Sequence, residues 1–159
     1  TELKRIVRET GADPLEFLEF LTPDEITGVS RSDPAWLECG GERYIMALKR
    51  DGHGCYFLKR GAPGCRIYDA RPFLCRLYPY AVHETREGDF QSFSLHKDVG
   101  CPRRHDGSVD TAPLYEMYLE DSEHQHAYAD LVTVFNRRQD PGKRPADFVT
   151  LFYENKRRS

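Results

Sequence analysis

The sequence lacks most of the features that identify common classes of protein. It has no run of 18 apolar residues, so it predicts no membrane span. It also lacks the motifs of common enzymes, namely Gly-x-Gly-x-x-Gly, the Walker loop, His-Glu-x-x-His and Gly-x-Ser-x-Gly. No internal repeat or low-complexity segment is present. These absences leave the cysteines as the strongest chemical signal in the chain.

The chain also has little net charge. Lys and Arg number 23 and Asp and Glu number 26, which gives a formal net charge of −3 and no general argument for nucleic-acid binding. We therefore expect no nucleic-acid partner, and a soluble, cytoplasmic protein. A length of 159 residues suits one domain with an appendage. We predict a cysteine-cluster metal-binding domain at residues 1–108 and a helical C-terminal extension at residues 109–159.

Five cysteines form an odd set, so a closed disulfide framework would leave one over. A reducing cytosol with metal-bound or free thiols fits this number better. Four of them, Cys55, Cys65, Cys75 and Cys101, lie among turn residues and arginines, which suits a soft metal or an iron–sulfur cluster. Their spacing is not the Cys-x-x-Cys of a zinc ribbon. Cys39 fits no such pattern and is interpreted as a free, partly buried thiol.

Residues 65–79 carry the most specific motif, Cys-x-Ile-Tyr-x-x-Arg-Pro-x-x-Cys-Arg-x-Tyr-Pro, preceded by Cys55-Tyr-Phe-Leu. Over about residues 1–105 the chain resembles the YkgJ-type cysteine-cluster family of zinc- or iron-chelating domains. The family's opening Cys-x-x-Cys-x-x-Cys-Cys has no counterpart in this sequence. Either that quartet lies upstream in a longer protein, or the chain lacks half of the family's ligands.

The resemblance implies that Cys55, Cys65, Cys75 and Cys101 bind the metal. We expect their sulfurs to converge within about 4 to 7 Å, because metal–sulfur bonds are about 2.3 Å long. With an upstream quartet the four could instead divide between two neighbouring sites. Close to the cysteines, Arg71, Arg76 and Tyr68 are expected to support the site, the arginines by stabilising thiolates or a cluster anion.

A 4Fe-4S cluster is favoured and zinc is the alternative cofactor, because an upstream quartet would bring the thiols to about eight. The favoured function is an iron–sulfur protein that acts in electron transfer, or as a maturation or accessory factor for a partner enzyme. One alternative is a structural zinc-binding interaction module within a larger complex. Another is a protein-lysine N-methylase, as for some relatives with this cysteine pattern, although the chain shows no recognisable S-adenosylmethionine loop. We expect a protein partner, and a chain that is not an enzyme by itself.

The predicted fold class is α+β, with N-terminal helices, short β-hairpins and a helical C-terminal tail. Helices are expected at residues 1–10, from Asp13–Pro14 onward with Leu15, Leu18 and Leu21 on one side, at 111–136 and at 145–155. Strands are expected at residues 42–49, 55–59, 65–68, 80–83 and 90–95. Pro72 is expected to begin a helical turn that carries Cys75 inward.

Overall fold

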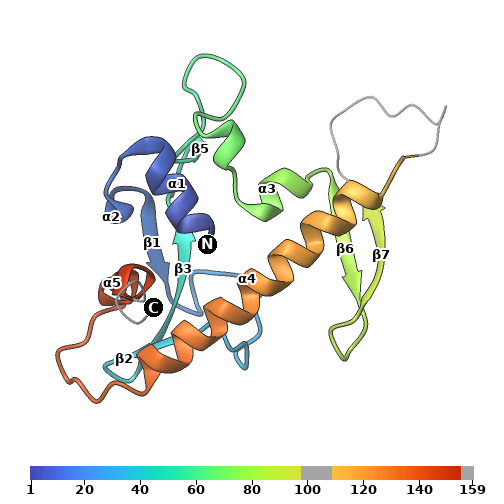
Figure 1. Ribbon diagram of the computed structural model, residues 1–159. Coiled ribbons are helices and arrows are strands. Elements are labelled where there is room, and N and C mark those ends of the chain that lie inside the picture. Colours follow the sequence, from blue (N-terminus) through green and yellow to red (C-terminus); the bar gives the residue numbers. More distant parts are fainter. Residues whose placement is uncertain (98–108, 155–159) are drawn as a thin grey trace. The chain divides into compact units, whose positions relative to one another are not determined.

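The computed structural model describes residues 1–97 and 109–154, which Figure 1 draws as a coloured ribbon. It contains helices and small antiparallel strand pairs, which confirms the predicted α+β class. Contacts within the chain define two compact units. Unit 1 comprises residues 1–70 and 124–159, and unit 2 comprises residues 71–123. The division predicted at residue 108 stays a prediction.

Unit 1 contains the termini and a three-stranded sheet. Its elements, in chain order, are α1 (Glu2–Thr10), α2 (Pro14–Phe17), β1 (Leu18–Leu21), β2 (Leu37–Cys39), β3 (Glu42–Leu48), β4 (Arg50–Asp51), β5 (Gly54–Cys55), η1 (Tyr68–Ala70), the end of α4 (Ala112–Asn136), η2 (Pro145–Asp147) and α5 (Phe148–Glu154). α1, β3 and α5 confirm the elements predicted near those positions.

The sheet of unit 1 is antiparallel, with β3 in the centre and the strand order β1-β3-β2. Its register pairs Leu18 of β1 and Leu37 of β2 with residues on β3. Gly40 and Gly41 form the turn between β2 and β3, and both have positive φ angles, which residues with a Cβ disfavour. The turn therefore lets β3 return directly beside β2.

The second helix is shorter than the sequence predicts. Asp13 caps the first turn of α2 as expected, but the helix ends at Phe17. Leu18–Leu21 instead forms the edge strand β1, which pairs with β3 along its whole length. Both Phe17 and Leu18 are buried, so packing and backbone pairing outweigh the helical spacing of the leucines.

The core of unit 1 combines side chains from both ends of the sequence. Phe17, Phe135 and Phe148 have no exposed surface, and the rings of the last two meet edge to face at 5.4 Å. The other buried members are Leu3, Ile6, Leu18, Leu37, Cys39, Phe57, Ile67, Ala70, Val132, Val149, Leu151 and Phe152. This core supports the segment that carries Cys55 and Cys65, since both residues pack against it.

Unit 2 combines α3 (Phe73–Leu77), the hairpin of β6 (Tyr80–Glu84) and β7 (Phe90–Leu95), and the first part of α4. The hairpin confirms the strands predicted at 80–83 and 90–95. The buried residues of unit 2 are Phe73, Leu77 and Tyr118, with Tyr80, Val82, Phe90, Phe93, Leu114 and Met117 packed against them. Although α4 has 25 residues, no helix in the described part of the chain is long and apolar enough to cross a membrane.

Candidate metal centre

Cys55 and Cys65, two of the four predicted ligands, lie in unit 1 on two consecutive hairpins. β4 pairs with β5, which places Cys55 opposite Arg50. A tight turn follows, in which the Leu58 N–H donates to the Cys55 carbonyl at 2.9 Å. The second hairpin then pairs Leu58 with Cys65 through an isolated bridge. Both cysteines are half-buried.

The strands predicted at residues 55–59 and 65–68 are wrong in extent. β5 ends at Cys55, the second hairpin is a single bridge, and Tyr68–Ala70 forms a 3-10 turn. Phe57 and Ile67 are both buried in the unit 1 core. Turns bring these two side chains into the core and interrupt the strand pairing. Each cysteine therefore lies next to a turn.

Arg66 joins the two cysteine-bearing hairpins. Its backbone N–H donates to the Phe57 carbonyl at 2.8 Å, and its guanidinium donates to the Tyr56 carbonyl. The guanidinium carbon also lies 5.0 Å from the centre of the Tyr56 ring, a cation–π distance. Because Tyr56 follows Cys55 and Arg66 follows Cys65, these contacts fix the backbone of one cysteine relative to the other. The sequence shows Arg66 only as a neighbour of a cysteine, without this bracing contact.

Cys75 lies on α3 in unit 2. Pro72 precedes the helix as predicted, but the prediction that the turn carries Cys75 inward is wrong, because Cys75 is exposed. Phe73 and Leu77 are four residues apart, share one side of α3 and are buried. Cys75 is two residues from each of them and so points to the opposite side.

The residues predicted to support the cysteines have different surroundings. Tyr68 is 60% exposed, and Arg71 is half-buried. Arg76 forms an ion pair with Glu120 of α4 at 3.5 Å, within unit 2. Its Nε is buried and has no hydrogen-bond partner among the described residues. Arg76 therefore joins α3 to α4 by pairing with a carboxylate.

Cys101, the fourth predicted ligand, lies outside the described residues. Within residues 1–97 and 109–154, no group of three or more His, Cys, Asp or Glu side chains is arranged to hold a metal ion. Cys55 and Cys65 belong to unit 1, whereas Cys75 belongs to unit 2. The convergence of the four sulfurs therefore stays a prediction. The half-buried thiols of the hairpins have the donor chemistry that soft metals prefer.

Cys39 has a different environment from the other cysteines. It lies on β2, forms no disulfide and is only 6% exposed, so it is more deeply buried than the sequence predicts. Burial raises the pKa of its thiol, and the opposing charge of Lys143 does not cancel this effect. The neutral thiol is a member of the unit 1 core, which argues against a metal-binding role.

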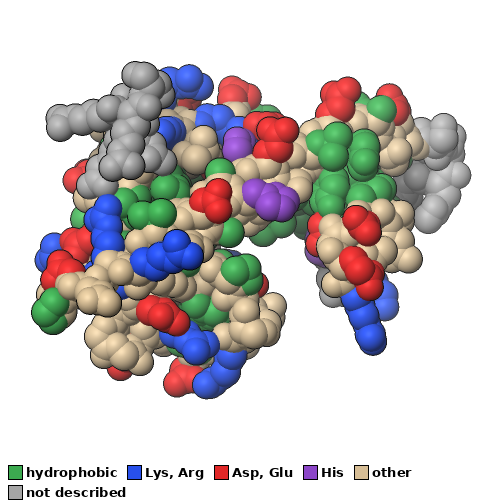
Figure 2. All heavy atoms as spheres, turned by 60° about the horizontal axis from the view of Figure 1, so that its bottom comes forward, with side chains coloured by type: hydrophobic (Ala, Val, Ile, Leu, Met, Phe, Trp, Pro, Cys, Tyr) green, Lys and Arg blue, Asp and Glu red, His purple; other side chains and the backbone are tan. Residues whose placement is uncertain are grey.

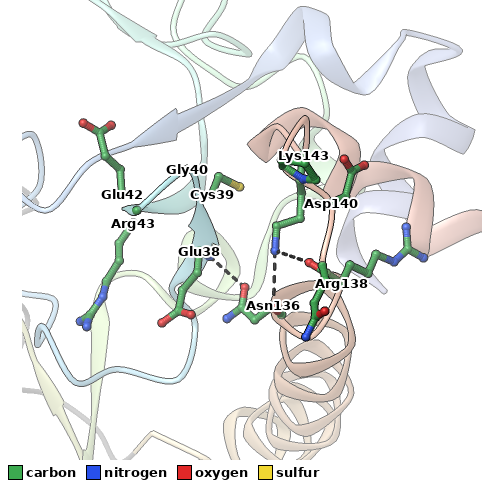
Figure 3. Close-up of a pocket in the computed structure, with 12 residues that line it drawn as sticks. Glu38, Cys39, Gly40, Glu42, Arg43, Asn136, Arg138, Asp140 and Lys143 are labelled. Carbon is green, nitrogen blue, oxygen red and sulfur yellow. Dashed lines mark hydrogen bonds between the residues drawn. The ribbon is translucent and has the colours of Figure 1, made fainter.

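An open pocket of about 600 Å³ lies between the β2–β3 turn and the end of α4 (Figure 3). Lys143 points at the end of α4 in Figure 3, where its Nζ donates to the Arg138 carbonyl at 3.3 Å. The same Nζ donates to the Phe135 carbonyl at 3.1 Å and offsets the negative end of the helix dipole. Asn136 crosses to β2, where its side chain bonds the Glu38 N–H and the Trp36 carbonyl at 2.8 and 2.9 Å. Because these polar groups bond to one another within the chain, we interpret the pocket as part of the structural junction between β2 and α4. The sequence does not predict the contacts of Asn136, because the bonded residues lie about a hundred positions apart.

The described structure is a small α+β fold with half-buried thiols on two short hairpins, and similarity to known proteins gives the family. The family model described as "Putative zinc- or iron-chelating domain", of the CxxCxxCC type, matches residues 18–102. The chain belongs to this family, as predicted, and metal binding is the property that the description gives. The uncharacterised protein MJ0661 of Methanocaldococcus jannaschii is 47% identical over 45 residues, 28% of this chain. The match covers 24% of that relative, and no solved structure matches.

Proposed function

We propose that the chain binds a 4Fe-4S cluster and serves in electron transfer, or as a maturation or accessory factor for a partner enzyme. The proposed ligands are the thiolates of Cys55, Cys65, Cys75 and Cys101. The observation that carries the proposal is the pair of half-buried cysteines on braced hairpins inside the matched region. When bound, such a cluster supplies one-electron chemistry at a potential set by its surroundings.

The surroundings of Cys55 and Cys65 suit a shielded centre. Tyr56 and Phe57 meet edge to face at 5.1 Å, and Phe57 packs on the fully buried Phe17 at 5.2 Å. These rings form an apolar support on the core side of the hairpins. An apolar wall limits the access of water to a cluster and thereby tunes its potential.

Metal analysis and an optical spectrum of anaerobically purified full-length protein test the proposal. We expect iron, acid-labile sulfide and a visible charge-transfer absorption that bleaches on reduction. Stoichiometric zinc with no visible absorption would refute the iron–sulfur cluster and leave metal binding intact. Protein that binds neither metal would refute both.

Serine substitutions identify the ligands. Cys55→Ser, Cys65→Ser, Cys75→Ser and Cys101→Ser should each lower the iron content, because serine replaces a soft thiolate with a hard, neutral donor. Cys39→Ala is the matched control and should retain the wild-type iron content. A variant among the four that keeps full iron content and the wild-type spectrum would remove that residue from the ligand set.

A structural zinc module is the second candidate, and the small core of unit 2 favours it. Only Phe73, Leu77 and Tyr118 are buried among the described residues of that unit. Cores of this size usually need a metal or another staple to hold a fold. The same four thiolates would satisfy a tetrahedral zinc ion. Zinc would stabilise the fold without changing oxidation state, so a redox titration separates the two candidates.

A further inference from the structure

Residues 49–66, here called the basic hairpin segment, differ in charge from the rest of the chain. The segment contains five basic residues, Lys49, Arg50, Lys59, Arg60 and Arg66, and one acidic residue, Asp51, a net charge of +4. The whole chain has a formal net charge of −3, so the remaining residues carry −7. On the face drawn in Figure 2, basic and acidic side chains are interspersed. The segment therefore concentrates one sign of charge around Cys55 and Cys65.

Contacts of the chain engage three of the five basic side chains. Lys49 Nζ donates to the carbonyls of Leu15 and Glu16. The Arg66 guanidinium donates to the Tyr56 carbonyl. Arg60 pairs with Asp51 at 2.9 Å, which uses the single carboxylate of the segment and joins the two hairpins. Arg50 and Lys59 are exposed and have no carboxylate partner among the described residues. The loop after β5 projects away from the sheet of unit 1 (Figure 1). A partner could thus reach these side chains.

Two exposed side chains stand directly beside the cysteines. Leu58 folds back over Gly54, with Cδ2 3.4 Å from the position that a Cβ would take there, yet it stays 46% exposed. Gly54 immediately precedes Cys55. The stem of Lys59 lies in the same way over Gly64, at 3.8 Å, and Gly64 immediately precedes Cys65. An apolar group and the stem of a cation therefore lie over the two residues that precede the cysteines.

We propose that the basic hairpin segment docks an acidic protein partner, with Leu58 at the centre of the contact and Arg50, Lys59 and Arg60 around it. The inference rests on the proposed function, because docking here would bring the partner to the metal held by Cys55 and Cys65. An apolar centre with surrounding charges is the usual composition of protein interfaces. Complementary charge speeds association and orients the two proteins.

A protein partner fits the charge distribution better than a nucleic acid. An acidic patch on a protein can be small enough to contact the segment alone, which has a net charge of +4. A long polyanion would also meet the residues outside the segment, which carry −7 in total and repel it. An acidic partner is also consistent with short-lived contact, since charge-steered interfaces of modest size are typical of redox encounters.

The test uses a labelled 12-residue acidic peptide with two central leucines, and fluorescence anisotropy on metal-loaded and metal-free protein. We expect binding at low salt that weakens as salt screens the charges. The double variant Lys59→Glu/Arg60→Glu should bind about tenfold more weakly, and Leu58→Ser about threefold more weakly. Since a glutamate at position 60 would face Asp51, the neutral variant Lys59→Gln/Arg60→Gln is measured as well and should show an intermediate loss.

Arg86→Glu/Arg137→Glu is the matched control, because it makes the same change in net charge at exposed positions outside the segment. Equal loss in the control and in both segment variants would overturn the docking site. Tighter binding of a 12-base-pair duplex than of the peptide would overturn the choice of a protein partner. Iron content is measured on every sample. Segment-dependent peptide binding by a protein without iron would refute the proposed function alone, and full iron content without such binding would refute the docking alone.

Discussion

The two units differ in how much buried apolar surface holds them together. In the described residues, the cluster of unit 1 has fifteen buried members, whereas that of unit 2 has three. We therefore expect the core of unit 1, on which Cys55 and Cys65 pack, to supply most of its stability. Unit 2 presents Cys75 on a five-residue helix over a small core, so it should depend more on the metal. We therefore expect metal binding to contribute less to the stability of unit 1 than to that of unit 2.

Metal removal should produce the largest effect and separates the units most clearly. Structural zinc contributes on the order of 10 kcal/mol to the folding of small domains, because metal binding is coupled to folding. Chelation or oxidative loss of the metal should loosen residues 50–105 first, with greater loss in unit 2 than in α1 or the end of α4. Hydrogen exchange of loaded and metal-free protein measures this as lost protection. Unchanged protection around Cys65 and Cys75 after complete removal would show that the cysteines do not hold the fold.

Truncation of a core aromatic residue should have the next largest effect. Phe17→Ala should lower the free energy of unfolding of unit 1 by about 3 to 5 kcal/mol, because it empties a fully buried site. Phe73→Ala removes a ring from the smaller core of unit 2 and should cost less. Urea unfolding followed by the fluorescence of Trp36, which is buried in unit 1, reports the first change. If Phe73→Ala shifts this transition as much as Phe17→Ala, the units do not unfold separately.

The parts of the fold that were predictable are those with strong local signals. The helix ending at Gly11, the strand β3 and the hairpin of β6 and β7 follow from caps, alternation and turn residues. β1 was not predictable, because its pairing with β3 joins residues 24 to 30 positions apart. The contacts of Asn136 with Glu38 and Trp36 were not predictable for the same reason, since they join residues about a hundred positions apart.

The candidate site shows the same limit. The motif from Cys65 to Pro79 is local, so the family could be predicted from the sequence, whereas the set of ligand cysteines stays a prediction. The direction of Cys75 could not, because a functional expectation pointed it inward while the burial of Phe73 and Leu77 turned it outward. The bracing role of Arg66 also depends on a hairpin that spacing predicts only in outline.

The phenol of Tyr118 allows a test that is confined to unit 2. Its hydroxyl donates to Glu84 Oε1 at 2.8 Å, and burial together with this carboxylate raises the pKa of Tyr118 to about 12. The fold thus favours the neutral phenol, so its stabilising effect is complete below pH 10 and is lost as the pH rises toward 12. Titration of tyrosinate absorbance should lose one high-pH component in Tyr118→Phe. If Tyr118→Phe instead loses a component that titrates near pH 10, Tyr118 is not buried against Glu84 as described.

Substitution of Arg66 should produce the smallest effect and tests the preorganisation of the two thiols in unit 1. Arg66→Met removes the guanidinium contacts with Tyr56 and keeps an apolar stem of similar length. An exposed cation–π contact contributes about 0.5 to 1 kcal/mol, so metal affinity should fall about two- to fivefold.

Arg66→Lys keeps the charge but loses the planar donor, and should recover only part of the affinity. Lys59→Met removes another exposed cation, whose stem lies over Gly64 next to Cys65, and serves as the control. Equal affinities for Arg66→Met and Lys59→Met would assign the effect to charge alone, whereas a deficit specific to Arg66→Met supports a brace that fixes Cys55 relative to Cys65.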